Sequence, residues 1–145
     1  MNRFILYTIF FHLLAITALS QDCTDYHQYH CTYADYTYFY SQQSKSLLLP
    51  PGQKSEMNII VYAGEEYYIA LCAHQKLGNV QFRILEDSPK RTEIYDNAKD
   101  NYSPSISFAN QRTRKLIIEI TTPSGKPGDK NKYCAGVLVE FKKKS

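Results

Sequence analysis

The sequence has no tryptophan and none of the short motifs that mark the common enzyme classes. It contains no nucleophile elbow, metalloprotease helix motif, phosphate-binding loop or dinucleotide fingerprint. Its formal net charge is only +3, and its basic residues form no stripe of the kind that nucleic-acid-binding domains carry. These absences argue against a nucleic-acid partner and against a catalytic role.

The rest of the composition is that of an ordinary globular protein. Hydrophobic residues make up 43% and charged residues 21% of the 145 positions, which suits a chain with one packed core. The unusual number is thirteen tyrosines, and six of them fall between residues 26 and 40. The sequence therefore directs attention to this short stretch near the N-terminus.

The first twenty residues have the three parts of a secretory signal peptide. Arg3 supplies a positive start, residues 4–19 are mostly apolar, and residues 18–20 fit the small-x-small cleavage pattern. A membrane anchor would need ~20 apolar residues, and this run is shorter. We predict that residues 1–20 are cleaved. The chain from Gln21 would then be exported to the periplasm, to an outer-membrane-associated position or to the outside of the cell.

The stretch Ser55–Ala73 shows the clearest strand pattern. Apolar residues alternate in its first half and again in its second half, which is typical of strands that bury one face. Residues 63–66 separate the halves, and Gly64 suits a tight turn. We predict that the two halves pair as a β-hairpin.

Short apolar patterns of this kind recur along the chain, separated by turn-forming residues. The expected strands are 36–41, 57–61, 67–72, 80–84, 92–97, 105–109, 116–121 and 133–141. About eight strands without a long helix predict an all-β fold, an antiparallel β-sandwich or jelly roll. Residues 42–145 would form the sandwich, and the Cys- and Tyr-rich residues 21–41 would join it in a single domain. The expected core residues are Met57, Ile59, Val61, Ile69, Leu71, Phe82, Ile84, Phe108, Leu116, Ile118 and Val137.

The four cysteines all lie beyond the predicted signal peptide. An even number of cysteines in an exported chain indicates disulfides, and four cysteines allow three pairings. We favour Cys23–Cys31, because the two are close in sequence. We favour Cys72–Cys134, because each lies in an apolar, strand-like run.

A zinc site is the alternative for the first pair. Cys23, His27, His30 and Cys31 have spacings that would place them on one face of a helix. Two thiolates and two imidazoles form a common structural zinc set. Exported thiols usually oxidise, so the disulfide is the preferred interpretation.

Four segments of the chain are similar to the small β-sandwiches called pre-peptidase C-terminal domains. The segments are AGEEYYIAL at 63–71, FRILED at 82–87, IYDN at 94–97 and LIIEI at 116–120. With its paired cysteines, the chain looks most like a stand-alone, four-cysteine exported relative of these domains. The resemblance implies a non-catalytic module that accompanies secreted bacterial enzymes. It carries over no functional residues.

A calcium site is a further candidate at the sequence YDNAKDNY. Its oxygen ligands would be Asp96, Asn97, Asp100 and Asn101, although they lack the ordered spacing of an EF-hand. Such residues also serve turns by bonding to their own backbone. We expect no cofactor.

The tyrosine-rich stretch is the candidate binding surface. Its members are Tyr26, Tyr29, Tyr33, Tyr36, Tyr38 and Tyr40. Tyrosine is enriched in recognition surfaces because its ring offers contact area with little entropy to lose. Alternatively, these rings cover the edge of the sandwich. We expect a non-catalytic protein-interaction or structural module of the bacterial envelope, or else a carbohydrate-binding module that stacks tyrosine rings on sugars. The partner would be an envelope protein or a glycan.

Overall fold

The computed structural model describes residues 22–144, and most of them lie in antiparallel strands. The predicted signal peptide lies outside the described residues. The helical elements are α2 (Tyr26–His30), η1 (Gln75–Leu77) and η2 (Asn97–Lys99). The strands are β1 (Phe39–Tyr40), β2 (Lys45–Leu49), β3 (Lys54–Val61), β4 (Glu65–Ala73), β5 (Gln81–Glu86), β6 (Glu93–Asp96), β7 (Ser105–Asn110), β8 (Arg114–Thr121) and β9 (Tyr133–Lys143). Within residues 22–144, no helix is long and apolar enough to cross a membrane.

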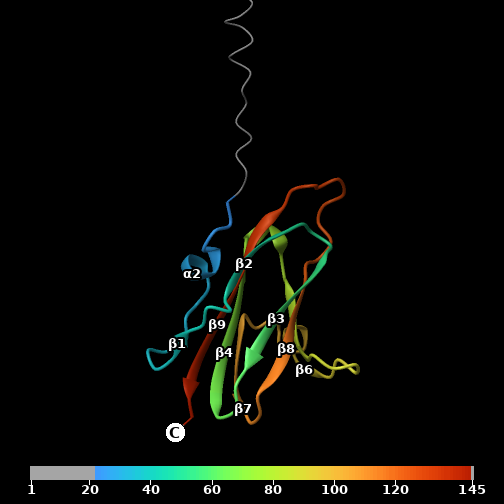
Figure 1. The fold of residues 1–145 in the computed structure, drawn as a ribbon. Helices are drawn as coiled ribbons and strands as arrows, with labels where there is room; N and C mark the ends of the chain where they lie inside the picture. The colour runs from blue at the N-terminus through green and yellow to red at the C-terminus, as the bar shows by residue number, and fades with distance from the viewer. Residues whose placement is uncertain (1–21, 145) are drawn as a thin grey trace, which may run out of the picture.

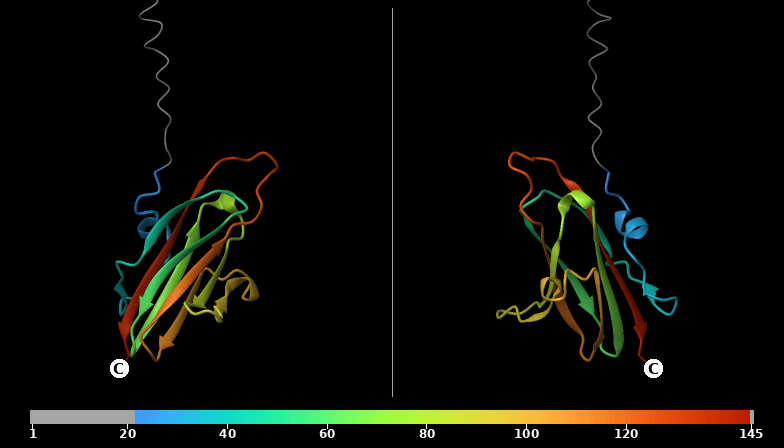
Figure 2. Two further views of the ribbon diagram at one scale, coloured as in Figure 1. Left: turned by 45° about the vertical axis from the view of Figure 1, so that its right-hand side comes forward. Right: turned by 180° about the vertical axis from the view of Figure 1, so that it is seen from behind.

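The strands form two sheets that pack face to face (Figures 1 and 2). The first sheet has the order β1-β9-β4-β7, and β2 also pairs with β9. The second sheet has the order β3-β8-β5-β6. Every pairing is antiparallel. The predicted fold class, an antiparallel β-sandwich with two disulfides, is therefore confirmed, with nine strands in place of about eight.

The core lies between the sheets and is built by the period-2 alternation of the strands. In β3, for example, Met57, Ile59 and Val61 are buried while the residues between them are more exposed. All the residues expected in the core belong to it, although Phe108 is only partly buried against it. Leu116–Ile120 runs through the middle of the second sheet, with β3 on one side and β5 on the other. Leu116, Ile118 and Ile120 face the core, whereas Ile117 and Glu119 lie on the outer face.

The predicted hairpin between β3 and β4 is wrong. The two strands are consecutive, but β3 pairs with β8 in the second sheet and β4 pairs with β7 and β9 in the first. The turn at Gly64, where φ is +79°, crosses from one sheet to the other. Alternation identifies the buried face of each strand, and the buried faces of β3 and β4 do pack into the same core. It does not identify the neighbour that each strand bonds to.

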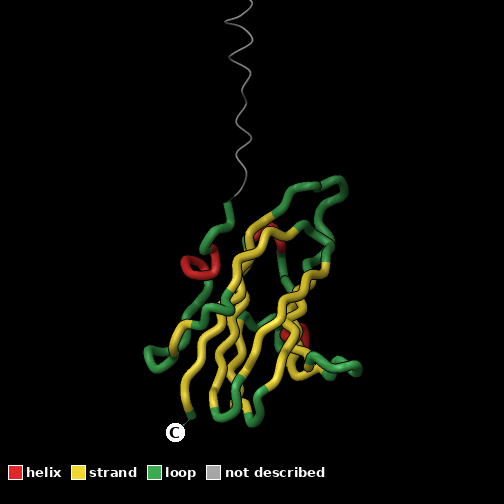
Figure 3. The backbone as a smooth tube through the Cα atoms, in the orientation of Figure 1, coloured by secondary structure: helices red, strands yellow, loops and turns green. Residues whose placement is uncertain are grey.

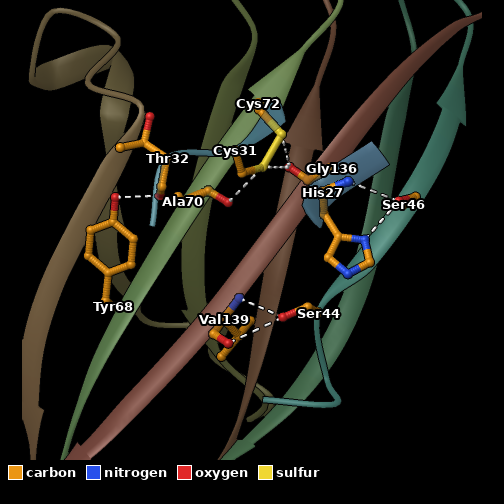
Figure 4. Close-up of a disulfide and its surroundings, with 10 residues drawn as sticks. All are labelled: His27, Cys31, Thr32, Ser44, Ser46, Tyr68, Ala70, Cys72, Gly136 and Val139. Carbon is orange, nitrogen blue, oxygen red and sulfur yellow. Dashed lines mark hydrogen bonds between the residues drawn. A yellow bond between two sulfur atoms is a disulfide. The ribbon is translucent and has the colours of Figure 1, made fainter. Parts of the chain in front are cut away.

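The outer edge of β9 is covered by two short strands instead of one long strand. β2 pairs with residues 133–137 of β9 and β1 with residues 140–141. Between them, the chain forms a turn at residues 41–44, and Ser44 Oγ bonds to the backbone of Val139 (Figure 4). Only residues 39–40 of the expected strand 36–41 form β1. Tyr36 lies instead in a turn closed by a bond from Tyr38 N–H to Asp35 O.

Candidate functional site

Residues 22–38 lie across the outer face of the first sheet, away from the core. α2 is seen beside β2 and β9 in the ribbon and in the tube of Figure 3. Two disulfides fasten this segment, Cys23–Cys134 to β9 and Cys31–Cys72 to β4. The predicted pairings Cys23–Cys31 and Cys72–Cys134 are therefore wrong.

The register of the sheet gives the physical reason for the observed pairing. Cys72 and Cys134 both point to the outer face, but Cys72 lies opposite Gly136. The N-terminal segment covers this face, and it brings one cysteine to each strand. Gly136 allows the close approach, because a Cβ atom there would lie only 2.6 Å from the Cα of His27. A helix of five residues is not stable alone, so these contacts hold α2 in place.

The zinc set predicted from the sequence does not assemble. The sulfurs of Cys23 and Cys31 are both in disulfides and are not available as thiolates. His30 stacks on Tyr26, with ring centroids 4.0 Å apart. His27 is buried under the segment. Zinc binding at this set is therefore excluded by the disulfides.

His27 is held between two hydroxyl groups. Its Nδ1 lies 2.8 Å from Ser46 Oγ and its Nε2 lies 2.9 Å from Tyr40 OH. Its backbone N–H also donates to Ser46 Oγ at 3.1 Å (Figure 4). Burial lowers the pKa of His27, and the negative charge of Asp25 opposes this only in part. A serine beside an imidazole is the pairing used in nucleophilic catalysis, but here it is covered and serves to anchor α2.

The six candidate tyrosines divide into two groups. Tyr26, Tyr38 and Tyr40 make contacts that hold the segment together or join it to the first sheet: Tyr26 stacks on His30, Tyr38 OH donates to Glu66, and Tyr40 bonds to His27. The other three are among the exposed large side chains, with Tyr29 at 79%, Tyr33 at 46% and Tyr36 at 98% exposure. We call Tyr29, Tyr33 and Tyr36 the exposed tyrosines.

An open hollow lies at the end of the first sheet where β9 ends, and Thr37, the residue after Tyr36, is part of its lining. Its volume is about 750 Å³. The residues that line it are Thr37, Phe39, Glu66, Phe141, Lys142, Lys143 and Lys144. The sequence did not predict this site. Its available signals were Phe39 within the tyrosine-rich stretch and the lysines that follow Phe141, which are far apart in sequence and meet only through the β1–β9 pairing.

The residues proposed for calcium are engaged in a turn. Asp96 Oδ1 accepts from Gln81 and from Ala98 N–H, and Asp100 Oδ2 accepts from Tyr95 OH. Asn97 is buried, and its amide bonds to the backbone of Val80, Phe82 and Ser103. Within residues 22–144, no group of three or more His, Cys, Asp or Glu side chains is arranged to hold a metal ion.

The outer face of the second sheet carries charges that neutralise one another. Glu119 is nearly buried, accepts from Arg83 at 2.5 Å and lies 3.2 Å from Lys54 Nζ. Burial alone would raise the pKa of Glu119, but the hydrogen bonds from Arg83 and Lys54 outweigh it and lower the pKa. The other arginines of the described chain are also paired. They form the pairs Arg91–Glu56, Arg112–Glu86 and Arg114–Glu86.

Comparisons with known proteins give one informative likeness. No protein-family model matches the chain, and no curated protein matches it by sequence. Among solved structures, it is similar to PliG of Aeromonas hydrophila, a periplasmic lysozyme inhibitor of g-type lysozyme. The TM-score is 0.50 and the identity is 15%, over 77% of this chain and 92% of that one. At this identity the likeness supports the fold alone.

Proposed function

We propose that this chain is an exported, non-catalytic module that binds another protein. The observation that carries the proposal is the exposure of Tyr29, Tyr33 and Tyr36 on a segment that two disulfides hold in place. A segment whose backbone is already held in place loses little backbone entropy on binding, and aromatic rings commonly supply most of the energy of a protein interface. The disulfides also fit the oxidising compartment that the predicted signal peptide implies.

The partner that we propose is a lysozyme or a related wall-cleaving enzyme. Support comes from the likeness in fold to PliG, a periplasmic lysozyme inhibitor of g-type lysozyme. In this proposal, the exposed tyrosines contact the surface of the enzyme and the sandwich serves as a rigid support. The resemblance to pre-peptidase C-terminal domains stays a prediction, and it also implies a non-catalytic role beside a secreted enzyme.

The test uses the chain from Gln21, produced with its disulfides formed. Binding to an immobilised g-type lysozyme is measured, together with inhibition of that enzyme on cell-wall substrate. We expect saturable binding, weakened at least tenfold when Tyr29, Tyr33 and Tyr36 are all changed to alanine. Tyr62→Ala is the matched control, because Tyr62 is 52% exposed but belongs to the turn after β3.

Two results would count against the proposal. Failure of the wild-type chain to bind the lysozyme would remove the named partner. Binding that is equally weakened by Tyr62→Ala and by the triple change would remove the exposed tyrosines as the contact surface. Melting curves of each variant establish that the loss is not due to unfolding.

Carbohydrate binding is the second candidate, and the same exposed rings favour it, because tyrosine can stack on the apolar face of a sugar. A glycan array separates the two functions. Reproducible binding of one glycan that is lost in the triple alanine variant, without any binding of lysozyme, would replace the protein partner by a sugar.

A further inference from the structure

The hollow at the end of β9 combines an apolar floor with a basic rim. The ring of Phe39 is 66% exposed, and its centroid lies 6.1 Å from that of Phe141. Phe141 in turn lies 6.3 Å from Tyr67, which is fully buried in the core. The floor is therefore continuous with the core and does not depend on a loop for its position.

One lysine of the rim is already neutralised. Lys142 Nζ lies 4.4 Å from the ring centroid of Tyr38 and 3.6 Å from Glu66 Oε1. Tyr38 OH donates to the same oxygen of Glu66 at 2.5 Å. Tyr38, Glu66 and Lys142 thus form a closed group that fixes one wall of the hollow and contributes no net charge to it.

The other two lysines have no such partner. Lys143 and Lys144 make no ion pair with any residue from 22 to 144. Glu65, which lies opposite Lys143 in the sheet, accepts from Tyr67 OH. Asp35, the other nearby carboxylate, accepts from the N–H and hydroxyl of Thr37. A hydrogen bond from a neutral donor does not cancel the charge of a carboxylate, but neither Glu65 nor Asp35 forms an ion pair with Lys143 or Lys144. The two ammonium groups therefore stand at the rim of an apolar surface without an ion pair to the described residues.

We propose that this hollow binds a single-chain anionic amphiphile, with a phosphate or carboxylate head and an alkyl chain. The head would contact Lys143 and Lys144, and the chain would cover Phe39 and Phe141. Both parts of the ligand are needed for the fit. A small hydrophilic anion would leave the phenyl rings in water, and a neutral apolar molecule would leave the ammonium groups without a counter-charge. The volume lies within the range of small-molecule sites.

The test is calorimetric titration of the chain from Gln21 with dodecyl phosphate below its critical micelle concentration. Dodecyl maltoside, which has the same chain and a neutral head, and inorganic phosphate, which has no chain, are titrated in parallel. We expect one dodecyl phosphate to bind per protein, at least tenfold tighter than either control ligand. Laurate in place of the phosphate is expected to bind at the same site.

Variants of the residues that line the hollow test where the ligand binds. Phe39→Ser and the pair Lys143→Gln with Lys144→Gln should each weaken binding at least tenfold. Lys126→Gln with Lys130→Gln is the matched control, because these lysines lie in the loop between β8 and β9, at the far end of the sandwich (Figure 2). That pair should change the affinity less than twofold. Phe39 is largely exposed, and a melting curve verifies that each variant is folded.

Several outcomes would overturn the proposal. If the changes at Lys143 and Lys144 and the changes at Lys126 and Lys130 weaken binding equally, the ligand is attracted by the net charge of the protein and does not occupy a defined site. If Phe39→Ser does not weaken binding, the apolar floor is not part of the binding site. Association only with vesicles that contain phosphatidylglycerol, without binding of the monomeric amphiphile, would indicate a membrane surface instead. None of these results decides whether lysozyme binds the exposed tyrosines, because that test uses different variants.

Discussion

His27 makes the packing of the N-terminal segment sensitive to pH. Burial lowers its pKa from the ordinary 6.5, so the folded state favours the neutral ring. The unfolded chain takes up a proton first as the pH falls. The contribution of His27 to the free energy of unfolding is therefore fully present above pH 6.5. It declines below that pH, until the folded protein also takes up the proton.

We expect this decline to be smaller in His27→Gln, which keeps polar atoms near Ser46 and Tyr40 but does not titrate. The measurement is urea unfolding at several pH values between 7.5 and 5. His30→Gln is the control, because His30 is exposed on the same short helix. If wild type and His27→Gln lose stability in parallel, the buried ring is not the cause of the pH dependence.

Two isoleucines on neighbouring strands test the assignment of inner and outer faces. Ile118 on β8 is fully buried, whereas Ile60 on β3 is 44% exposed. We expect Ile118→Ala to lower the free energy of unfolding by about 2–5 kcal/mol, the usual range for a large-to-small change in a core. Ile60→Ala should cost less than about 1 kcal/mol, because it opens no cavity. Similar losses in the two variants would show that the faces are assigned wrongly.

At the scale of the element, the free edge of β3 is partly closed by a side chain. Gln43, in the turn between β1 and β2, accepts from Ile60 N–H at 2.6 Å and donates to Ile60 O at 3.0 Å. Its amide thus takes the place of one residue of a neighbouring strand. An uncovered edge strand can pair with an edge strand of another molecule. We therefore expect this contact to hinder such pairing at β3.

We expect Gln43→Leu to lower stability by about 1 kcal/mol, the usual net value of a hydrogen bond, and to increase self-association. Urea unfolding gives the first quantity and sedimentation velocity over a range of concentrations gives the second. Gln43→Glu is the matched control, since it keeps the length and the acceptor but loses the donor. A Gln43→Leu protein that stays as monomeric as wild type would mean that the edge needs no such cover.

The strands could be predicted from the sequence, and their partners could not. Alternation placed the strands predicted at 57–61, 80–84 and 116–121 correctly to within one residue inside β3, β5 and β8, because it depends only on which side chains face a core. The crossing of the chain between β3 and β4 depends on contacts with strands β8 and β9, which follow much later. The same reason explains why the hollow around Phe39 was missed.

The cysteine pairing shows this difference most clearly. Cys23 and Cys31 are neighbours in sequence, and proximity favoured joining them. In the structure, α2 separates them and each meets a strand of the first sheet. The tyrosine pattern was informative only in part, because Tyr38 and Tyr40 are used to fasten the segment while Tyr29, Tyr33 and Tyr36 face outward.

At the scale of the whole molecule, the protein has three layers: the second sheet, the first sheet and the N-terminal segment (Figure 1). The third layer is thin, and it packs on a small apolar cluster of Ala70, Leu138 and the disulfide Cys31–Cys72. This disulfide closes a loop with a sequence separation of 41, which corresponds to about 4 kcal/mol in the chain-entropy model.

The disulfide Cys23–Cys134 spans 111 residues and encloses both cysteines of the other pair. Any single break of the backbone between Cys23 and Cys134 therefore leaves two pieces that are still covalently joined. We expect a chain with a protease site built into the exposed turn at Tyr36 to run as one band on a non-reducing gel after cleavage, and as two bands after reduction. Sequential pairing, Cys23–Cys31 with Cys72–Cys134, would release two separate pieces at once. A protein built in this way can be cut once by a protease and remain a single molecule.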